Sequence, residues 1–184
     1  KFTYYILSSN FGEFFLILFA LLLGQYFGWQ YLVPLLVFQI LWINLVSDGI
    51  TAVALSQEQG EPNIMERKPT KKEIITKNII LMLIGVGILI AGGSLLLFRN
   101  AFSLGEIKAQ TMAFTSLFIF ETFNLFNFRS FRNSFVKNFF ANKSLLFAVV
   151  LTMVFHFALL YIPFLQNLFG TTSLTLDEWL LIIP

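Results

Sequence analysis

The sequence has 184 residues, of which 57% are hydrophobic and 12% are charged, and its mean hydropathy is +0.79. Soluble globular domains carry about 25% charged residues, so the composition excludes a soluble domain and predicts an integral membrane protein. The absence of Cys and the single His exclude disulfides, a catalytic thiol and a zinc site. The net charge of +2 is too small to indicate a nucleic-acid partner.

Long apolar runs predict an all-α fold, a polytopic bundle of transmembrane helices, because spanning a bilayer takes about 20 apolar residues. We expect five full spans and a truncated sixth. Their approximate ranges are 2–24, 33–55, 74–98, 111–128, 144–162 and 176–184. The short aromatic connection after the first run predicts an antiparallel hairpin. Because the chain starts with Lys1 and its last run is too short to span, we expect a piece of a longer polypeptide.

The basic residues predict how the bundle is oriented. The connections after the second and fourth expected spans, with Lys77 included, carry nine Lys or Arg, whereas the connections after the first, third and fifth carry only Arg99 and Lys108. Basic loops face the cytoplasm. We therefore expect the N-terminal end of the chain to be cytoplasmic.

The third expected span is rich in glycine. It contains Gly85, Gly87, Gly92 and Gly93. Small residues allow membrane helices to approach closely, so we expect close packing, or a bend, along this span.

Polar residues inside the second apolar run share one helical face. Asn44, Ser47 and Asp48 are spaced i, i+3 and i+4, which places them on one side of a helix. Gly49, the next residue, weakens a helix and could let it unwind to expose carbonyl groups. An acid at membrane depth is costly and marks a functional site.

Two other spans repeat the pattern. Asn10 and Glu13 in the first span are spaced i, i+3, as are Glu121 and Asn124 in the fourth. No Lys or Arg lies at similar depth to pair with the acids, and unpaired buried carboxylates take up protons or bind cations. A single such acid is often only a packing contact, but three beside amides and hydroxyls favour a cation site.

Oxygen ligands of this kind suit Ca²⁺, which takes about 6–8 oxygens. They also suit Na⁺, or proton carriage by the acids alone. His156 is expected to be a packing residue with a hydrogen bond, and Gln39 and Gln110 are expected to be helix-packing or interfacial amides.

Three motifs point to a known family. They are Ser8-Ser9-Asn10-Phe11-Gly12-Glu13, Leu41-Trp42-Ile43-Asn44-Leu45-Val46-Ser47-Asp48-Gly49 and Asn63-Ile64-Met65-Glu66-Arg67-Lys68-Pro69. In order and spacing they resemble the membrane region of type II P-type cation-transporting ATPases, most closely the sarco/endoplasmic-reticulum-type calcium pumps and their prokaryotic relatives. The resemblance runs from the fifth membrane helix to the start of the tenth, and identifies residues 1–184 as a C-terminal transmembrane cation-transport domain.

The resemblance implies a set of metal ligands and two calcium sites. Its members would be Asn10 and Glu13 from the fifth helix, Asn44, Ser47 and Asp48 from the sixth, and Glu121 from the eighth. Asp48 matches the position that bridges both sites. Ser47 stands where calcium pumps usually have Thr. The loop 57–72 matches the one that touches the phosphorylation domain, although it departs from the usual double-proline ending.

The resemblance also implies what lies outside the chain. ATP and Mg²⁺ would act only in a full-length parent, because no Asp-Lys-Thr-Gly-Thr phosphorylation motif occurs here. The chain alone therefore has no catalytic site for ATP hydrolysis. Its partners would be the lipid bilayer and the parent's other membrane helices and cytoplasmic domains, in the cell membrane if the source is prokaryotic.

Three alternatives stay open. The first is a pump for sodium or another cation, since the loop 56–61 looks somewhat more like that of sodium pumps. The second is a proton-coupled secondary carrier, which would show internal repeats of broken helices; no convincing repeat occurs between the two halves. The third is a membrane scaffold in which the acids serve as packing contacts.

Overall fold

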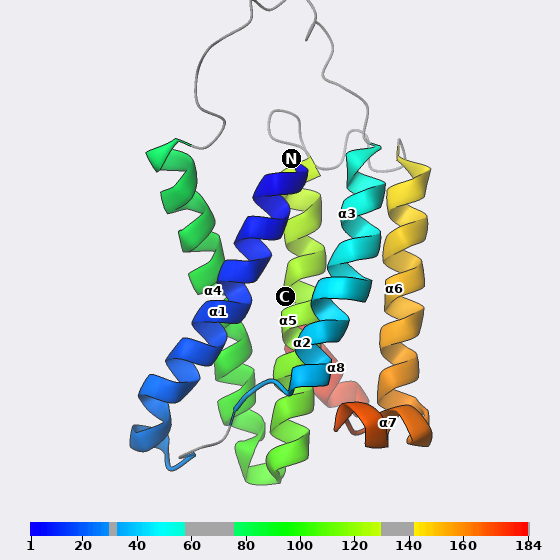
Figure 1. The fold of residues 1–184 in the computed structure, drawn as a ribbon. Coiled ribbons are helices and arrows are strands. Elements are labelled where there is room, and N and C mark those ends of the chain that lie inside the picture. The colour runs from blue at the N-terminus through cyan, green and yellow to red at the C-terminus, as the bar shows by residue number, and fades with distance from the viewer. Residues whose placement is uncertain (30–32, 58–75, 130–141, 184) are drawn as a thin grey trace, which may run out of the picture.

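The computed structural model describes residues 1–29, 33–57, 76–129 and 142–183, and every regular element in these ranges is a helix (Figure 1). The predicted all-α class is thereby confirmed for the part of the chain that the structure describes. The long elements are α1 (Phe2–Phe27), α4 (Lys77–Ala101), α5 (Glu106–Arg129) and α6 (Lys143–Tyr161), together with a second span made of α2 (Val37–Leu41), η1 (Trp42–Ser47) and α3 (Asp48–Ser56). The short elements are η3 (Phe102–Leu104), α7 (Pro163–Phe169) and α8 (Leu176–Ile182).

Four helical segments in the described ranges are long and apolar enough to cross a membrane: 2–27, 37–56, 77–104 and 143–161. Helix α5 lies where the fourth span is expected but is not among these four, and α8 has only seven residues. The count of five full spans and a partial sixth therefore stays a prediction.

Helix α5 is the central helix of the bundle. All its residues from 109 to 119 are buried, so this stretch of the helix has no stripe that faces outward. Polar residues are tolerated here because their hydroxyl groups bond to the backbone one turn earlier: Thr111 to the Ile107 carbonyl (2.7 Å) and Ser116 to that of Ala113 (2.9 Å). Burial all round explains why α5 is less apolar than its neighbours.

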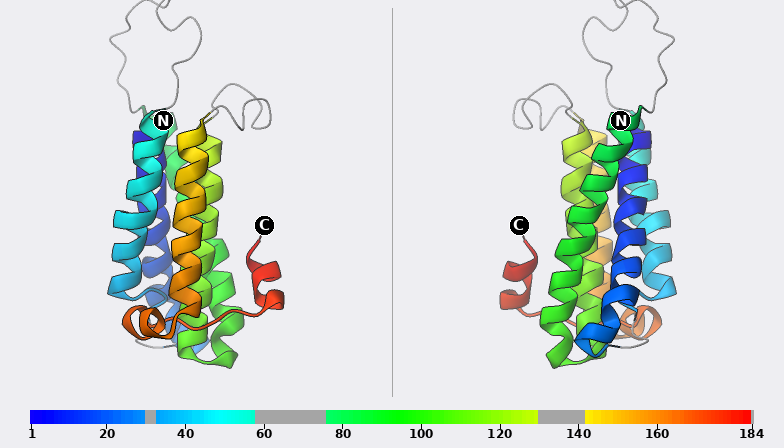
Figure 2. Two further views of the ribbon diagram at one scale, coloured as in Figure 1. Left: turned by 90° about the vertical axis from the view of Figure 1, so that its right-hand side faces the viewer. Right: turned by 90° about the vertical axis from the view of Figure 1, so that its left-hand side faces the viewer.

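The other long helices surround α5. Helix α1 packs along α4, α4 packs along α5, and α3 packs along α6. Figure 1 shows α1 and the second span running in opposite directions beside one another. The turn after α1 uses Gly28, whose φ of 76° is left-handed and suits glycine. We call the end of the bundle opposite the N-terminus the far end; Figure 2 shows α7 lying across it.

Two of the four glycines in α4 serve close packing. A Cβ added to Gly87 would lie 2.6 Å from Phe11 Cβ and 2.9 Å from the Phe11 carbonyl carbon, and one on Gly93 would lie 2.7 Å from the ring of Phe120. Gly85 and Gly92 have nothing within 4 Å of the same position. The expected close packing is thus present at Gly87 and Gly93 only.

Several predicted features lie outside the described residues. They include almost all of the loop 57–72, the motif Asn63–Pro69 and both basic residues between α5 and α6, Arg132 and Lys137. The orientation of the bundle, which depends on these residues, stays a prediction.

Candidate cation site

The second span changes its helical form where the polar residues lie. Residues Trp42–Ser47 form a π-helix between α2 and α3, and such wide turns are frequent at functional sites. Gly49, where we expected unwinding, lies within the α-helix Asp48–Ser56. The expectation of unwinding at Gly49 is therefore wrong. The irregular turn lies before Gly49, and it is a π-helix and not an unwound segment.

Glu13 of α1 is held by an amide from the π-helix. Its carboxylate oxygens accept from Asn44 Nδ2 at 2.8 and 2.7 Å, and Asn44 Nδ2 also lies 3.1 Å from the Ile40 carbonyl. Glu13 is 8% exposed. The pair joins α1 to the second span, and no cationic side chain is involved.

Asp48, the first residue of α3, is buried and only half satisfied. Its Oδ1 accepts from the Tyr5 hydroxyl at 2.7 Å, whereas Oδ2 has no hydrogen-bond partner. Thr51 lies 3.3 Å from the same Tyr5 hydroxyl, and its own hydroxyl donates to the Ser47 carbonyl at 2.8 Å. One oxygen of Asp48 is therefore fixed in place and the other remains free to bind.

Glu121 of α5 is fully buried, and neither of its carboxylate oxygens has a hydrogen-bond partner. Beside Glu121, Asn124 donates to Ser8 Oγ at 2.8 Å, so a neutral contact holds α5 to α1 here. A buried carboxylate without a donor is costly, and a proton or a cation would relieve that cost.

The six predicted ligands are only partly brought together. Glu13 contacts Asn44, and Ser47 and Asp48 are buried next to that pair along the chain, whereas Asn10 is exposed on α1. Among the described residues, no three His, Cys, Asp or Glu side chains form a ready-made metal cluster. A cation site formed by the six residues therefore stays a prediction.

Sequence reasoning missed two partners on α1. Tyr5 binds Asp48, and Ser8 accepts from Asn124. Tyr5 lies eight residues, about two turns, before Glu13 on the same side of the helix, whereas Ser8, five residues before Glu13, faces another direction. The spacing could therefore have indicated Tyr5 but not Ser8.

The residues expected to pack do so. His156 of α6 stacks on Phe118, with ring centroids 4.2 Å apart, and its Nε2 lies 3.2 Å from Thr115 Oγ1. The buried amide of Gln110 donates to the Val33 carbonyl at 3.0 Å. Gln39 is likewise buried and bonded to backbone groups.

The apolar helices and the carboxylates buried among them define a multi-pass integral membrane protein with an ionisable interior. Residues 32–184 match the family model described as cation transporting ATPase, C-terminus, and the chain belongs to this family.

Similar curated proteins are calcium-transporting ATPases. The chain is 36% identical over 190 residues to the calcium-transporting ATPase of Bacillus subtilis (strain 168), in a match that covers 100% of this chain and 20% of that protein. It is 33% identical to the calcium-transporting ATPase 1 of Bacillus cereus (95% of this chain, 21% of that protein). It is 28% identical to the endoplasmic reticulum calcium ATPase srcA of Aspergillus fumigatus (97% and 22%).

The predicted resemblance to P-type calcium pumps is thereby confirmed, and the carrier and sodium-pump alternatives are not favoured. The chain spans about a fifth of the length of these relatives.

Proposed function

We propose that the chain is the C-terminal membrane region of an ATP-driven calcium pump and that it supplies most of the ligands for the transported ion. The observation that carries the proposal is the state of Asp48, which is 1% exposed, with one oxygen held by Tyr5 and the other without a partner. Glu121, with two unpartnered oxygens, supports it. A hard cation would satisfy these oxygens together.

The ligands would be Glu13 and Asn10 from α1, Asn44, Ser47 and Asp48 from the second span, and Glu121 from α5. Asn44 now points its amide N–H at both oxygens of Glu13. An arriving cation must displace this donor, after which Asn44 can offer its carbonyl oxygen. Asn10, exposed about one turn before Glu13, would complete the site against helices that precede it in the longer polypeptide.

Calcium is the proposed cargo for two reasons. Carboxylate, amide and hydroxyl oxygens are the ligands that Ca²⁺ prefers, and the curated relatives are named for calcium transport. ATP, Mg²⁺ and the aspartyl-phosphate chemistry would belong to the remainder of the polypeptide, which would switch the access of the site between the two sides of the membrane.

The proposed topology has five full spans and the start of a sixth, with α5 as the fourth and α8 opening the last. The N-terminus and the ends of α3 and α6 nearest it would face the cytoplasm, which the basic connections favour. The far end would then lie outside the cytoplasm, in the cell membrane if the source is prokaryotic.

Neutralising the buried acids tests the proposal in the full-length protein. Glu13→Gln and Glu121→Gln are expected to raise the calcium concentration for half-maximal uptake into vesicles by about tenfold or more, the change for about 1.4 kcal/mol of lost binding energy. Glu106→Gln is the matched control, because Glu106 is exposed on the same helix as Glu121. Unchanged calcium dependence in both buried variants would contradict the proposal.

A further inference from the structure

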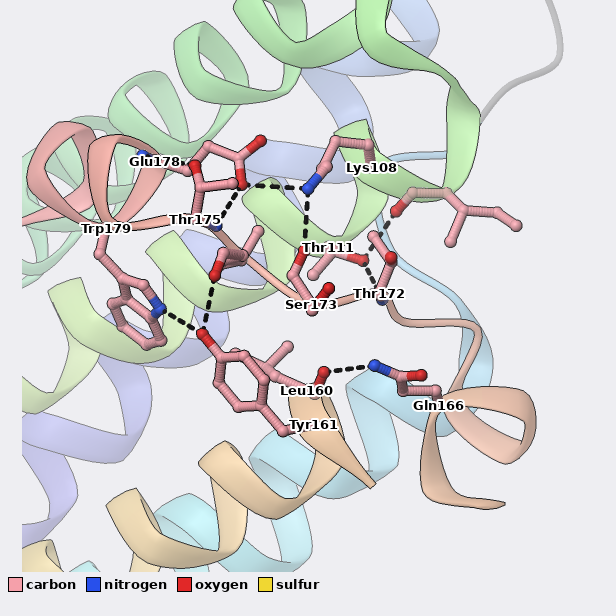
Figure 3. Close-up of polar contacts among 12 residues, drawn as sticks. Lys108, Thr111, Leu160, Tyr161, Gln166, Thr172, Ser173, Thr175, Glu178 and Trp179 are labelled. Carbon is pink, nitrogen blue, oxygen red and sulfur yellow. Dashed lines mark hydrogen bonds and ion pairs between the residues drawn. The ribbon is translucent and has the colours of Figure 1, made fainter. Parts of the chain in front are cut away.

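Consecutive residues of the connection between α7 and α8 form hydrogen bonds with side chains of the neighbouring helices (Figure 3). Helix α5 contributes Thr111, whose hydroxyl accepts from Thr172 N at 3.1 Å, and Lys108, which donates to the Ser173 carbonyl at 2.8 Å. Helix α6 contributes Tyr161, whose hydroxyl donates to the Leu174 carbonyl at 2.8 Å. Residues 170–175 are thus a fixed platform at the far end of the bundle, and we call them the far-end platform.

Lys108 also binds α8 to this platform. Its Nζ lies 3.0 Å from Glu178 Oε2, and the same oxygen accepts from Thr175 N at 2.7 Å. The Trp179 indole donates to the Tyr161 hydroxyl at 3.0 Å. The ends of α5, α6 and α8 are therefore held together by side chains that meet on one short stretch of backbone.

One side chain extends this network to the second span. Gln39 of α2 is 0% exposed, and its Nε2 donates to the carbonyls of Phe169 (3.0 Å) and Gly170 (3.4 Å). Its Oε1 accepts from Leu36 N at 3.1 Å. Since Phe169 and Gly170 lie at the end of α7, the amide nitrogen of Gln39 joins α2 to α7, while the amide oxygen caps the start of α2.

Aromatic rings surround the same joint. The ring of Phe169 meets Trp42 edge-on at 5.9 Å and Phe38 at 6.3 Å. Trp42 is also the first residue of the π-helix. The clamped part of the second span therefore ends where the wide turn begins, and the ligands Asn44 to Asp48 follow directly.

We propose that Gln39 is a positioning residue that fixes the far end of the second span to α7, so that the ligands Asn44, Ser47 and Asp48 move by deformation of the π-helix and not by sliding of the whole span. π-helical turns are rare but are frequent at functional sites, and a clamp on the side that precedes this turn confines movement to it. The inference rests on the proposed function, because it concerns how the proposed ligands are placed.

The test compares Gln39→Leu with Gln166→Leu in the full-length protein. Gln166 is a matched control, since it lies in α7 and its amide donates only to the Leu160 carbonyl, without a link to the second span. Two quantities are measured: hydrogen exchange of the backbone over residues 163–175, and the calcium concentration that half-saturates ATP-dependent uptake, alongside the maximal rate.

Gln39→Leu is expected to speed hydrogen exchange over 163–175 and to shift the half-saturating calcium concentration by about tenfold, whereas Gln166→Leu loosens α7 but keeps the wild-type calcium dependence. Gln39→Glu retains the acceptor for Leu36 N, places an oxygen against two carbonyls, and should behave like Gln39→Leu; it serves as the second variant if the first does not fold.

Wild-type calcium dependence in the folded Gln39 variants overturns the inference alone. Absence of calcium-dependent uptake in the wild type overturns the proposed function with it, while hydrogen exchange still reports on the Gln39 contact.

Discussion

Replacing Asp48 by Asn is expected to abolish calcium-dependent transport in the full-length protein, to below about 1% of the wild-type rate at the calcium concentration that saturates the wild type. Asn keeps the shape of the side chain and can still accept from the Tyr5 hydroxyl, so the hydrogen bond that now orients Asp48 at 2.7 Å is preserved. What is lost is the charge and the free oxygen Oδ2. The measurement is calcium-stimulated ATP hydrolysis together with uptake.

Two comparisons sharpen this result. Glu121→Gln should be less severe than Asp48→Asn, because Asp48 matches the position that bridges both of the calcium sites that the family resemblance implies. His156→Ala should keep the wild-type half-saturating calcium concentration, because His156 packs on Phe118 and Thr115 and is not a proposed ligand. Equal transport by Asp48→Asn and the wild type would rule out Asp48 as a ligand.

The second large effect is expected at the crossing of α1 and α4. Gly87→Ala should lower the free energy of unfolding by about 1–3 kcal/mol, although Ala favours helix over Gly by about 1 kcal/mol. The added Cβ would lie 2.9 Å from the Phe11 backbone carbon and 3.1 Å from Gly12 N. Backbone atoms cannot turn aside as a side chain does, so the two helices must separate.

Gly85→Ala is the matched control on the same helix, two residues earlier. Nothing lies within 4 Å of its added Cβ, so this variant should be as stable as the wild type or slightly more stable. Thermal denaturation of the detergent-solubilised protein compares the two. Equal melting temperatures for Gly87→Ala and Gly85→Ala would show that α1 and α4 do not approach as described.

Apolar runs were sufficient to predict helices, because run length is a direct physical requirement for crossing a bilayer. The π-helix could not be predicted in this way, because one extra residue in a turn does not alter an almost uniformly apolar pattern. Gly49, where we expected the helix to unwind, lies after the π-helix in a regular α-helix. The glycines of α4 show the same limit. Only the register against α1 and α5 distinguishes Gly87 and Gly93 from Gly85 and Gly92.

The acids of the candidate site could be predicted because a carboxylate in an apolar run is conspicuous. The hydrogen-bond partners of these acids depend on which helices pack against each other. The sequence alone could therefore not predict that Asn10 is exposed or that Asn44 contacts Glu13. The Tyr5–Asp48 bond, by contrast, could have been suspected from the helical spacing of Tyr5 and Glu13. Gln39 could not, since its partners lie 130 and 131 residues away.

The measurement that tests the central claim most directly is formation of a phosphoenzyme from ATP by the full-length protein, across a panel of Ca²⁺, Mn²⁺, Na⁺ and K⁺. We predict that micromolar Ca²⁺ alone triggers phosphorylation and that Asp48→Asn removes the response. Phosphorylation triggered by Na⁺ would contradict the choice of ion, and no phosphoenzyme with any cation would contradict the pump itself.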